Sequence, residues 1–146
     1  MLYVVTGPPG AGKSTWIQAR AKPQDIVIDL DRMALAMAGP GADHHAHGET
    51  LLKVVHRARF AALNEAYQHL DQVDVYVIHT QPSAKALAKY KRLKAKVVVV
   101  DPGRDVVMQR VRSMRQPGME RVVTRWYNHR PKQASQGVMP QRSRDW

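Results

Sequence analysis

Short apolar runs alternate with longer segments of helical periodicity along this chain. Four runs rich in valine, isoleucine and tyrosine are predicted to be β-strands, at residues 2–5, 25–28, 73–78 and 96–100. The segments between them space their apolar residues as amphipathic helices do. Since strands that alternate with helices form parallel sheets, the pattern predicts an α/β fold with four to five strands and helices on both faces.

Residues 49–70 are the longest segment with helical spacing. Its apolar residues recur every three to five positions, which predicts one face packed on the sheet: Leu52, Val55, Phe60, Leu63 and Tyr67. Further helices are predicted after residue 13, from Asp31, over 83–94 and over 104–115, with Ser83 and Asp101 as candidate starting residues. We predict one domain over 1–130 and a basic tail over 131–146, which is expected to be poorly ordered.

The stretch GPPGAGKST, residues 7–15, directly follows the first predicted strand. It fits the pattern G-x-x-x-x-G-K-[ST], which is typical of loops that bind nucleotide phosphates. Glycines let such a loop aim successive N–H groups at one anion, and the N-terminus of the next helix adds partial positive charge. We predict that ATP binds here, with Lys13 at its β- and γ-phosphates and Ser14 as a ligand of Mg²⁺. The predicted ATP-binding residues are Gly7, Pro9, Gly10, Ala11, Gly12, Lys13, Ser14 and Thr15.

The net charge of +11 is concentrated in the second half of the chain. Residues 1–84 carry 7 Lys and Arg against 8 Asp and Glu, whereas residues 85–146 carry 16 against 4. A positive field favours polyanions, so nucleic acid is the predicted partner. The alternative interpretation is that KALAKYKRLKAK, residues 85–96, is only a solvated basic helix.

Composition also narrows the class of protein. The absence of cysteine excludes disulfides and thiolate metal sites, and it suits a reducing compartment. No run approaches the roughly 20 apolar residues of a membrane span, and no signal peptide precedes the phosphate loop. We therefore expect a cytoplasmic protein without a membrane partner.

Acidic side chains follow the second predicted strand, where a parallel sheet gathers its ligands. Asp29 and Asp31 lie there, and Thr80 follows the third strand. We predict that Asp31 orients an attacking hydroxyl near the γ-phosphate and accepts its proton. The alternative is that Asp31 is only the N-cap of the helix that begins there, and the two roles are compatible.

Three arginines lie in MQRVRSMRQPG, residues 108–118. Negative charge spreads over a phosphoryl group during transfer, so cations that close over it lower the barrier. The turn signal Gln116-Pro117-Gly118 suggests that this arm acts as a lid. We predict Arg110 and Arg115 as catalytic and Arg112 as substrate-binding. The alternative is that these arginines contact only solvent or nucleic-acid phosphates.

Histidines and aromatic residues form two further clusters. His44, His45 and His47 lie in GPGADHHAHGE, residues 39–49, and are predicted to contact phosphate or solvent rather than zinc, because no cysteine is available and adjacent histidines seldom converge on one ion. Trp126 and Tyr127 in RWYNHR, residues 125–130, either stack on bases or anchor the last helix to the core.

Several of these segments together resemble a known family. GPPGAGKSTW, VIDLDRMALAM, VYVIHTQPS, VVVVDP and the arginine-bearing arm are similar to polynucleotide-kinase-type P-loop kinases, including small single-domain versions from bacteriophages and the related phage DNA hydroxymethyluracil kinases. The resemblance covers roughly residues 2–130. It implies a P-loop NTPase fold with an arginine-bearing lid, ATP and Mg²⁺ as cofactors, DNA more than RNA as partner, and the host cytoplasm as the location of a phage-encoded enzyme.

The resemblance also assigns roles to residues. It implies Asp31 as the base, Lys13, Ser14 and Thr15 as ligands of ATP and Mg²⁺, and Arg110 and Arg115 as the lid arginines. The acceptor side is then predicted at Asp29, Arg32, Thr80, His44, His45 and Arg112. Two positions differ from the family, which often has an arginine at the position of Ala34 and an acidic residue at that of His79.

Two other functions are compatible with the phosphate loop. One is a kinase of free nucleosides or nucleotides, which would share the ATP site. The other is an ATPase module that couples hydrolysis to a partner, although VVVVD, residues 97–101, is followed by Pro-Gly and not by an acidic residue. The acceptor hydroxyl and the oligomeric state stay open at this point.

Overall fold

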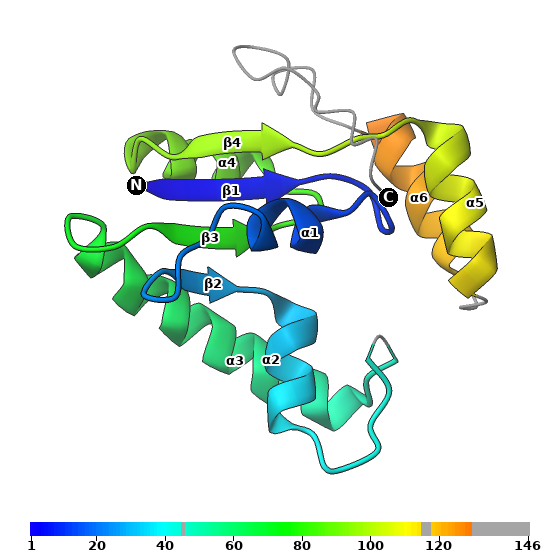
Figure 1. The fold of residues 1–146 in the computed structure, drawn as a ribbon, viewed down its shortest axis with the longest axis horizontal. Coiled ribbons are helices and arrows are strands. Elements are labelled where there is room, and N and C mark those ends of the chain that lie inside the picture. The colour runs from blue at the N-terminus through cyan, green and yellow to red at the C-terminus, as the bar shows by residue number, and fades with distance from the viewer. Residues whose placement is uncertain (45, 115–117, 130–146) are drawn as a thin grey trace.

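A four-stranded parallel sheet forms the centre of the molecule. The computed structural model of this chain describes residues 1–44, 46–114 and 118–129. Its strands are β1 (Leu2–Thr6), β2 (Ile26–Ile28), β3 (Val75–Ile78) and β4 (Lys96–Val99), in the spatial order β2-β3-β1-β4 (Figure 1). The predicted α/β fold with a parallel sheet of four strands is confirmed.

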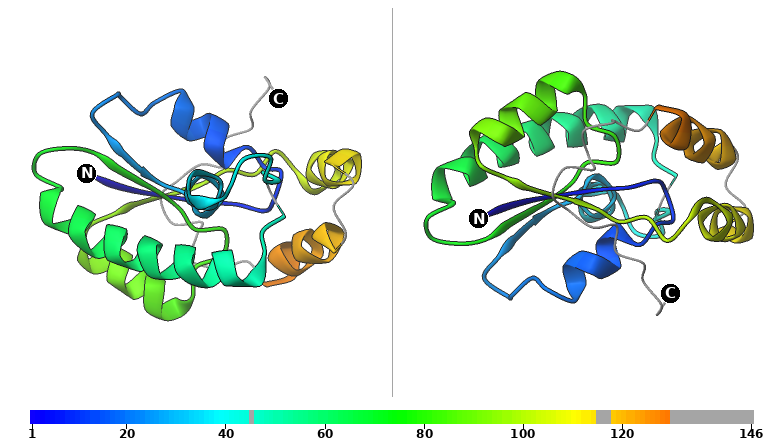
Figure 2. Two further views of the ribbon diagram at one scale, coloured as in Figure 1. Left: turned by 90° about the horizontal axis from the view of Figure 1, so that it is seen from below. Right: turned by 90° about the horizontal axis from the view of Figure 1, so that it is seen from above.

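Helices cover both faces of the sheet and extend beyond the carboxyl ends of its strands. They are α1 (Lys13–Gln18), α2 (Leu30–Met37), α3 (Glu49–Ala66), α4 (Ala84–Arg92), α5 (Arg104–Met114) and α6 (Met119–His129), and a 3₁₀ turn, η1 (Tyr67–His69), follows α3. Figure 2 shows α1 on one face of the sheet and α3 with α4 on the other. In Figure 1, α5 and α6 lie beyond the carboxyl ends of the strands, where ligands bind in such sheets. Among the described helices, none combines the length and hydropathy that crossing a membrane requires.

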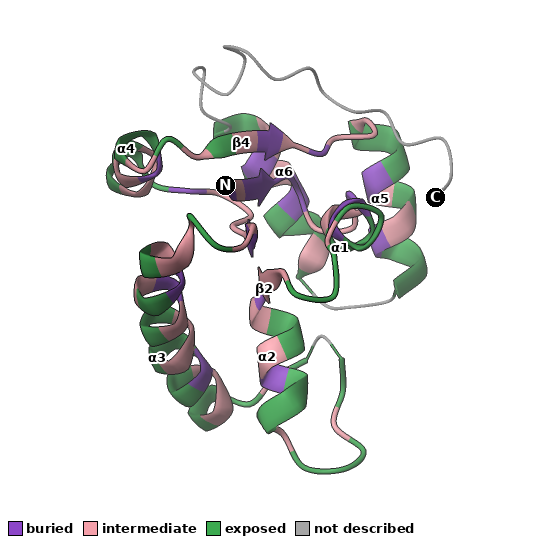
Figure 3. Cartoon of the chain, turned by 60° about the vertical axis from the view of Figure 1, so that its left-hand side comes forward, coloured by how far each residue is buried: buried purple, intermediate pink, exposed green. Residues whose placement is uncertain are grey.

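Alternating side chains of the strands supply two separate cores. Leu2, Val4 and Val77 point toward α3 and α4, where Leu63 and Tyr90 are also buried. On the other face, the buried residues come from β1, β3, β4, α1, α5 and α6, and they include Val5, Tyr76, Trp16, Val107 and Val123. The period of two along each strand thus secures helices on both faces. In Figure 3, the buried residues of α3 lie on the side that faces β2 and α2.

The prediction for the buried face of α3 is wrong for one residue. Val55 and Leu63 are buried as expected, but the side chain of Phe60 is 66% exposed. At 3.6 residues per turn, position 60 lies about 140° from position 55, whereas position 59 lies only about 40° away. Arg59 therefore faces the sheet, and its guanidinium donates to the Ile78 carbonyl at 3.2 Å.

The helix starts correct one prediction and confirm another. Helix α2 begins at Leu30 with Asp29 as its N-cap, not at Asp31, because the Asp29 carboxylate accepts a hydrogen bond from the Asp31 backbone N–H. Ser83 caps α4 as predicted. Asp101 lies before α5 without being its first residue, and its carboxylate accepts from Gly103 N–H at 3.0 Å. The predicted tail 131–146 lies outside the described residues.

Candidate active site

The first six residues of GPPGAGKST, 7–12, form a tight loop between β1 and α1. Gly7, Gly10 and Gly12 have φ angles of 147°, 74° and 97°, a region that side-chain-bearing residues rarely adopt. Gly7 also lies directly against the backbone after β4, so that a Cβ there would lie 2.2 Å from the Val100 carbonyl oxygen. The loop conformation therefore requires glycine at this position for two independent reasons.

Replacing Gly7 by alanine is expected to destabilise the protein by about 2 to 3 kcal/mol, from backbone strain and displacement of the Val100 carbonyl. Urea denaturation measures the free energy of unfolding. Gly103→Ala is the matched control, since Gly103 has φ 112° but nothing lies within 4 Å of the position that a Cβ would take there. It should cost only about 1 kcal/mol. Equal losses in the two variants would contradict the close approach at Gly7.

Lys13 lies across the loop with its ammonium buried. Its Nζ donates to the carbonyl oxygens of Gly7 and Pro8 at 2.9 and 2.8 Å. Burial lowers its pKa to about 8, although the charges of Asp29 and Asp31 act in the opposite direction. The first turn of α1 presents N–H groups without intrahelical partners beside this ammonium. Donors and charge thus fit the phosphates of a nucleoside triphosphate.

The lowered pKa predicts how nucleotide binding depends on pH. Above pH about 8 the Lys13 ammonium loses its proton in the free protein. A bound triphosphate favours the charged form, so it raises the pKa and binding takes up a proton. We expect affinity for a non-hydrolysable ATP analogue to fall as the pH rises above about 8, with proton uptake seen by calorimetry in buffers of different ionisation enthalpy. An affinity that stays constant up to pH about 9.5 would contradict this account of Lys13.

Asp29 and Ser14 lie together beside the loop. Asp29 is only 6% exposed, and burial raises the pKa of its carboxyl, an effect that the backbone N–H of Asp31 partly offsets. The Ser14 hydroxyl donates to Asp29 Oδ2 at 3.5 Å, and Lys13 and Arg32 act on Asp29 through their charges. A hydroxyl and a carboxylate beside a phosphate-binding loop are the oxygen donors that Mg²⁺ prefers, so these residues fit the ion.

Asp31 lies two residues further along, at the start of α2. It follows the carboxyl end of β2, as the phosphate loop follows that of β1, and its charge acts on the Lys13 ammonium. The Asp31 side chain is 51% exposed, and its Oδ1 accepts a hydrogen bond from His47 Nε2 at 2.9 Å. The exposed carboxylate suits a role toward an external hydroxyl better than the buried Asp29 does.

The arm formed by α5 and α6 brings one arginine to the phosphate loop. Arg110 donates to the Gly10 carbonyl at 3.0 Å, and burial lowers its pKa. Arg112 lies two residues further along α5, hence on another side of the helix, and its Nε donates to Glu120 at 2.9 Å. Arg115 lies outside the described residues. The structure thus brings Arg110 to the phosphate loop and pairs Arg112 with α6.

Backbone atoms of the segment after β3 connect the loop to α6. The Thr80 carbonyl accepts from Gly7 N–H at 3.4 Å and from the Trp126 indole at 2.8 Å. Trp126 is buried and the Tyr127 hydroxyl donates to Asp101 at 2.6 Å, so both aromatic residues anchor the last helix. Of the two interpretations of RWYNHR, anchoring is the one observed, and Trp126 is not available for stacking on bases.

The other predicted residues differ in their exposure and in whether they are described. Arg32 and His44 are exposed, and His45 lies outside the described residues. The described parts of the chain hold no group of three or more His, Cys, Asp or Glu side chains that could bind a metal ion together. His79, where the family often has an acid, lies with its Nδ1 2.8 Å from the Tyr90 hydroxyl, and burial lowers its pKa to about 4. Ala34 is fully buried, which leaves no room there for an arginine.

Two contacts here were not predicted from the sequence. Asp29, which is predicted on the acceptor side, caps α2 and accepts from Ser14. His47, which is predicted to contact phosphate or solvent, is bonded to Asp31. A capping residue directly after the strand was a usable signal for the first contact. The second depends on the path of the loop between α2 and α3, for which the sequence offers no periodic pattern.

Comparison with known proteins identifies the family. The model of the family described as "AAA domain" matches residues 2–125. No curated protein matches the chain by sequence. Solved structures with a similar fold include shikimate kinase from Bacteroides thetaiotaomicron, with 20% identity and TM-score 0.62 over 99% of this chain and 89% of that one. The tunicamycin resistance protein of Deinococcus radiodurans has 19% identity and TM-score 0.53, over 95% of this chain and 84% of that one.

A further structure with a similar fold is that of the Pnkp1/Rnl/Hen1 RNA repair complex. It has 18% identity and TM-score 0.60, and the match covers 87% of this chain but only 44% of that one. The present chain thus spans less than half the length of that relative. At these identities the likeness establishes a shared fold, whereas the family match extends over most of the sequence. The chain belongs to the AAA domain family and has the fold of the P-loop kinases.

Proposed function

We propose that this protein is an ATP- and Mg²⁺-dependent kinase that transfers a γ-phosphoryl group to a hydroxyl carried by nucleic acid. The observation that carries the proposal is the meeting of three elements at one edge of the sheet. Lys13 comes from the phosphate loop, Asp31 from α2 and Arg110 from α5. A cation beside the phosphates, a carboxylate for the hydroxyl and a second cation from a lid are the parts that phosphoryl transfer needs.

Each residue then has a distinct role in the reaction. Lys13 holds the β- and γ-phosphates once they replace the loop carbonyls as its partners, and Arg110 brings a second positive charge to the same loop. Ser14, with Asp29 behind it, would hold Mg²⁺, which neutralises phosphate charge when bound. Asp31 orients the acceptor hydroxyl and takes its proton. Positioning and charge supply the catalysis, without a covalent intermediate on the protein.

Two observations support a nucleic-acid acceptor. The second half of the chain carries a large excess of positive charge, which ATP binding alone does not require. One structure of similar fold belongs to a complex named for RNA repair. A polynucleotide 5′-hydroxyl or a hydroxymethylated base in DNA is the acceptor that we favour.

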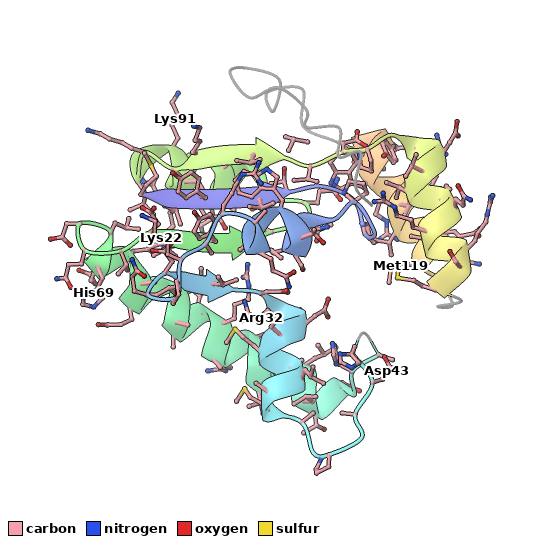
Figure 4. The ribbon with its side chains drawn as sticks, viewed as in Figure 1. Lys22, Arg32, Asp43, His69, Lys91 and Met119 are labelled. Atoms are coloured by element: carbon pink, nitrogen blue, oxygen red, sulfur yellow. The ribbon has the colours of Figure 1, made fainter. Side chains whose placement is uncertain are left out.

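The placement of the basic run favours a second candidate, a kinase of small free acceptors. Lys91 lies at the end of the sheet opposite the phosphate loop, far from Arg32 and Met119 in Figure 4. The run at 85–96, along α4 and the start of β4, therefore carries much of the positive charge away from the reacting groups. A structure of similar fold over nearly the whole chain is named for the small molecule shikimate.

A panel of acceptors tests the proposal and separates the two candidates. The protein is incubated with labelled ATP and with 5′-hydroxyl oligonucleotides, hydroxymethylated DNA or free nucleosides, and the products are identified. For an oligonucleotide held by about three phosphate contacts, we expect KM to rise on the order of tenfold between about 50 and 200 mM salt. Turnover restricted to free nucleosides, with little salt dependence, would establish the second candidate.

A variant of the basic run sharpens the result. Lys91 and Arg92 are both exposed on α4, and changing both to alanine should leave ATP binding intact. If oligonucleotides reach the far end of the sheet, this variant raises their KM and leaves that of a nucleoside unchanged. If the run is only a solvated helix face, the KM of both acceptors stays at the wild-type value.

A further inference from the structure

A histidine from the loop between α2 and α3 is bonded to the acidic residue of the site. His47 Nε2 lies 2.9 Å from Asp31 Oδ1, and the residues are 16 positions apart. The His47 side chain is only 5% exposed, whereas that of Asp31 is 51% exposed. Because the imidazole is enclosed and the carboxylate is open, the pair is arranged as a buried support behind an accessible group.

The loop that carries His47 has a local hydrogen bond just before it and the start of α3 just after it. Just before it, Asp43 Oδ1 accepts from Ala46 N–H at 2.9 Å, and just after it, Gly48 is the N-cap of α3. In Figure 4, Asp43 lies in the loop between α2 and α3, below the end of the molecule that holds the phosphate loop. The path of this loop therefore determines where the imidazole meets α2.

We propose that His47 is a positioning residue for Asp31, an inference that rests on the proposed kinase function. A carboxylate in the first turn of a helix rotates when only water surrounds it, and a misplaced base lowers the rate sharply. An ionised carboxylate only accepts hydrogen bonds, so the donor is the Nε2–H of the imidazole. The bond holds one oxygen of Asp31 while the carboxylate keeps its charge and its capacity to accept the hydroxyl.

Phosphoryl transfer by this site does not require any proton to pass through His47. As the acceptor oxygen bonds to the γ-phosphorus, the bond from that phosphorus to the bridging oxygen breaks, and ADP departs with the electron pair. The hydroxyl proton passes to Asp31 and later to solvent. His47 is thus a positioning residue and not a catalytic one, because it acts on the hydroxyl only through the Asp31 carboxylate that it contacts. Its contribution is the orientation of the carboxylate before the proton is transferred.

Three substitutions separate the hydrogen bond from packing. His47→Gln keeps an amide N–H at about the reach of Nε2, His47→Asn carries the same amide one methylene shorter, and His47→Phe keeps a ring without a donor. We expect His47→Asn and His47→Phe to lower kcat for acceptor phosphorylation about 10- to 100-fold. His47→Gln should retain most of the activity, and ATP-analogue affinity should be unchanged in all three.

A second histidine pair provides the control. His69 Nε2 lies 2.9 Å from Glu65, the same distance and kind of pair, but at the opposite end of the sheet (Figure 4). His69→Phe should leave kcat at the wild-type value. Thermal unfolding of every variant identifies any that fails to fold, and the comparison of His47→Gln with His47→Asn then decides.

The outcomes distinguish this inference from the function on which it rests. If the wild type transfers phosphate and the Gln, Asn and Phe variants all keep its kcat, the role of His47 is overturned and the proposed kinase function stands. Equal losses in the Gln and Asn variants also overturn it, because the effect would then be one of packing. A wild type that phosphorylates no acceptor overturns the proposed function, and the positioning role with it.

Discussion

Lys13→Met is expected to lower kcat/KM by at least about 100- to 1,000-fold toward every acceptor, the range for removing one fixed donor to a developing charge. The methionine keeps the unbranched stem of the side chain but has no ammonium to contact the β- and γ-phosphates. Because Lys13 serves the nucleotide and not the acceptor, the loss should be the same for oligonucleotides and free nucleosides. Steady-state kinetics with labelled ATP measures it.

Stability measurements separate this loss from unfolding. In the folded protein the pKa of Lys13 is about 8, below its ordinary value of 10.5, because burial disfavours the ammonium. Such a group destabilises the folded state below pH about 8 and relieves that cost as the pH rises toward its unfolded value. Lys13→Met should therefore unfold at or above the wild-type temperature at pH about 7. A folded variant with full transfer activity would contradict the phosphate role.

Asp31→Asn is expected to lower kcat by at least about 100-fold while ATP-analogue binding stays intact. The amide keeps the size of the carboxylate and an oxygen that can accept from His47, but it cannot take the proton of an acceptor hydroxyl. Single-turnover transfer measures the chemical step, and calorimetry measures nucleotide affinity. Asp71→Asn is the control, because Asp71 is exposed in the turn before β3.

This substitution also separates a kinase from an ATPase module. A protein that couples hydrolysis to a partner would hydrolyse ATP at nearly the wild-type rate after Asp31→Asn, since no acceptor hydroxyl takes part. If hydrolysis persists and no acceptor is phosphorylated by either protein, the assignment of Asp31 as a base is wrong. Retention of nucleotide binding together with loss of transfer supports the kinase.

The strands and the phosphate loop could be predicted because they depend on neighbouring residues. Strands show as short β-branched runs, and the loop as glycines at fixed intervals before Lys13. The prediction for Phe60 failed because several apolar residues compete for one helix face, and the exact turn angle decides in favour of Arg59. Spacing alone does not resolve such competition.

Some parts of the candidate site could be predicted from the sequence and others could not. The placement of Lys13 and Asp31 at the carboxyl ends of the strands follows from the rule for parallel sheets, whereas Arg110 was predicted from the arginine-bearing arm. Two carboxylates, Asp29 and Asp31, can each cap a helix that starts nearby, and the position of Asp29 directly after the strand is the signal that the prediction missed. The bond from His47 could not be predicted, because it joins two segments through an irregular loop.

The shared carbonyl of Thr80 has a consequence for how the molecule opens. One oxygen accepts from Gly7 in the phosphate loop and from Trp126 in α6, and Arg110 ties α5 to the same loop. Detaching the last two helices therefore removes supports of the nucleotide-binding backbone as well. Loop, α5 and α6 should form one cooperative unit of local unfolding, whose amide hydrogens exchange together and are protected together by bound nucleotide.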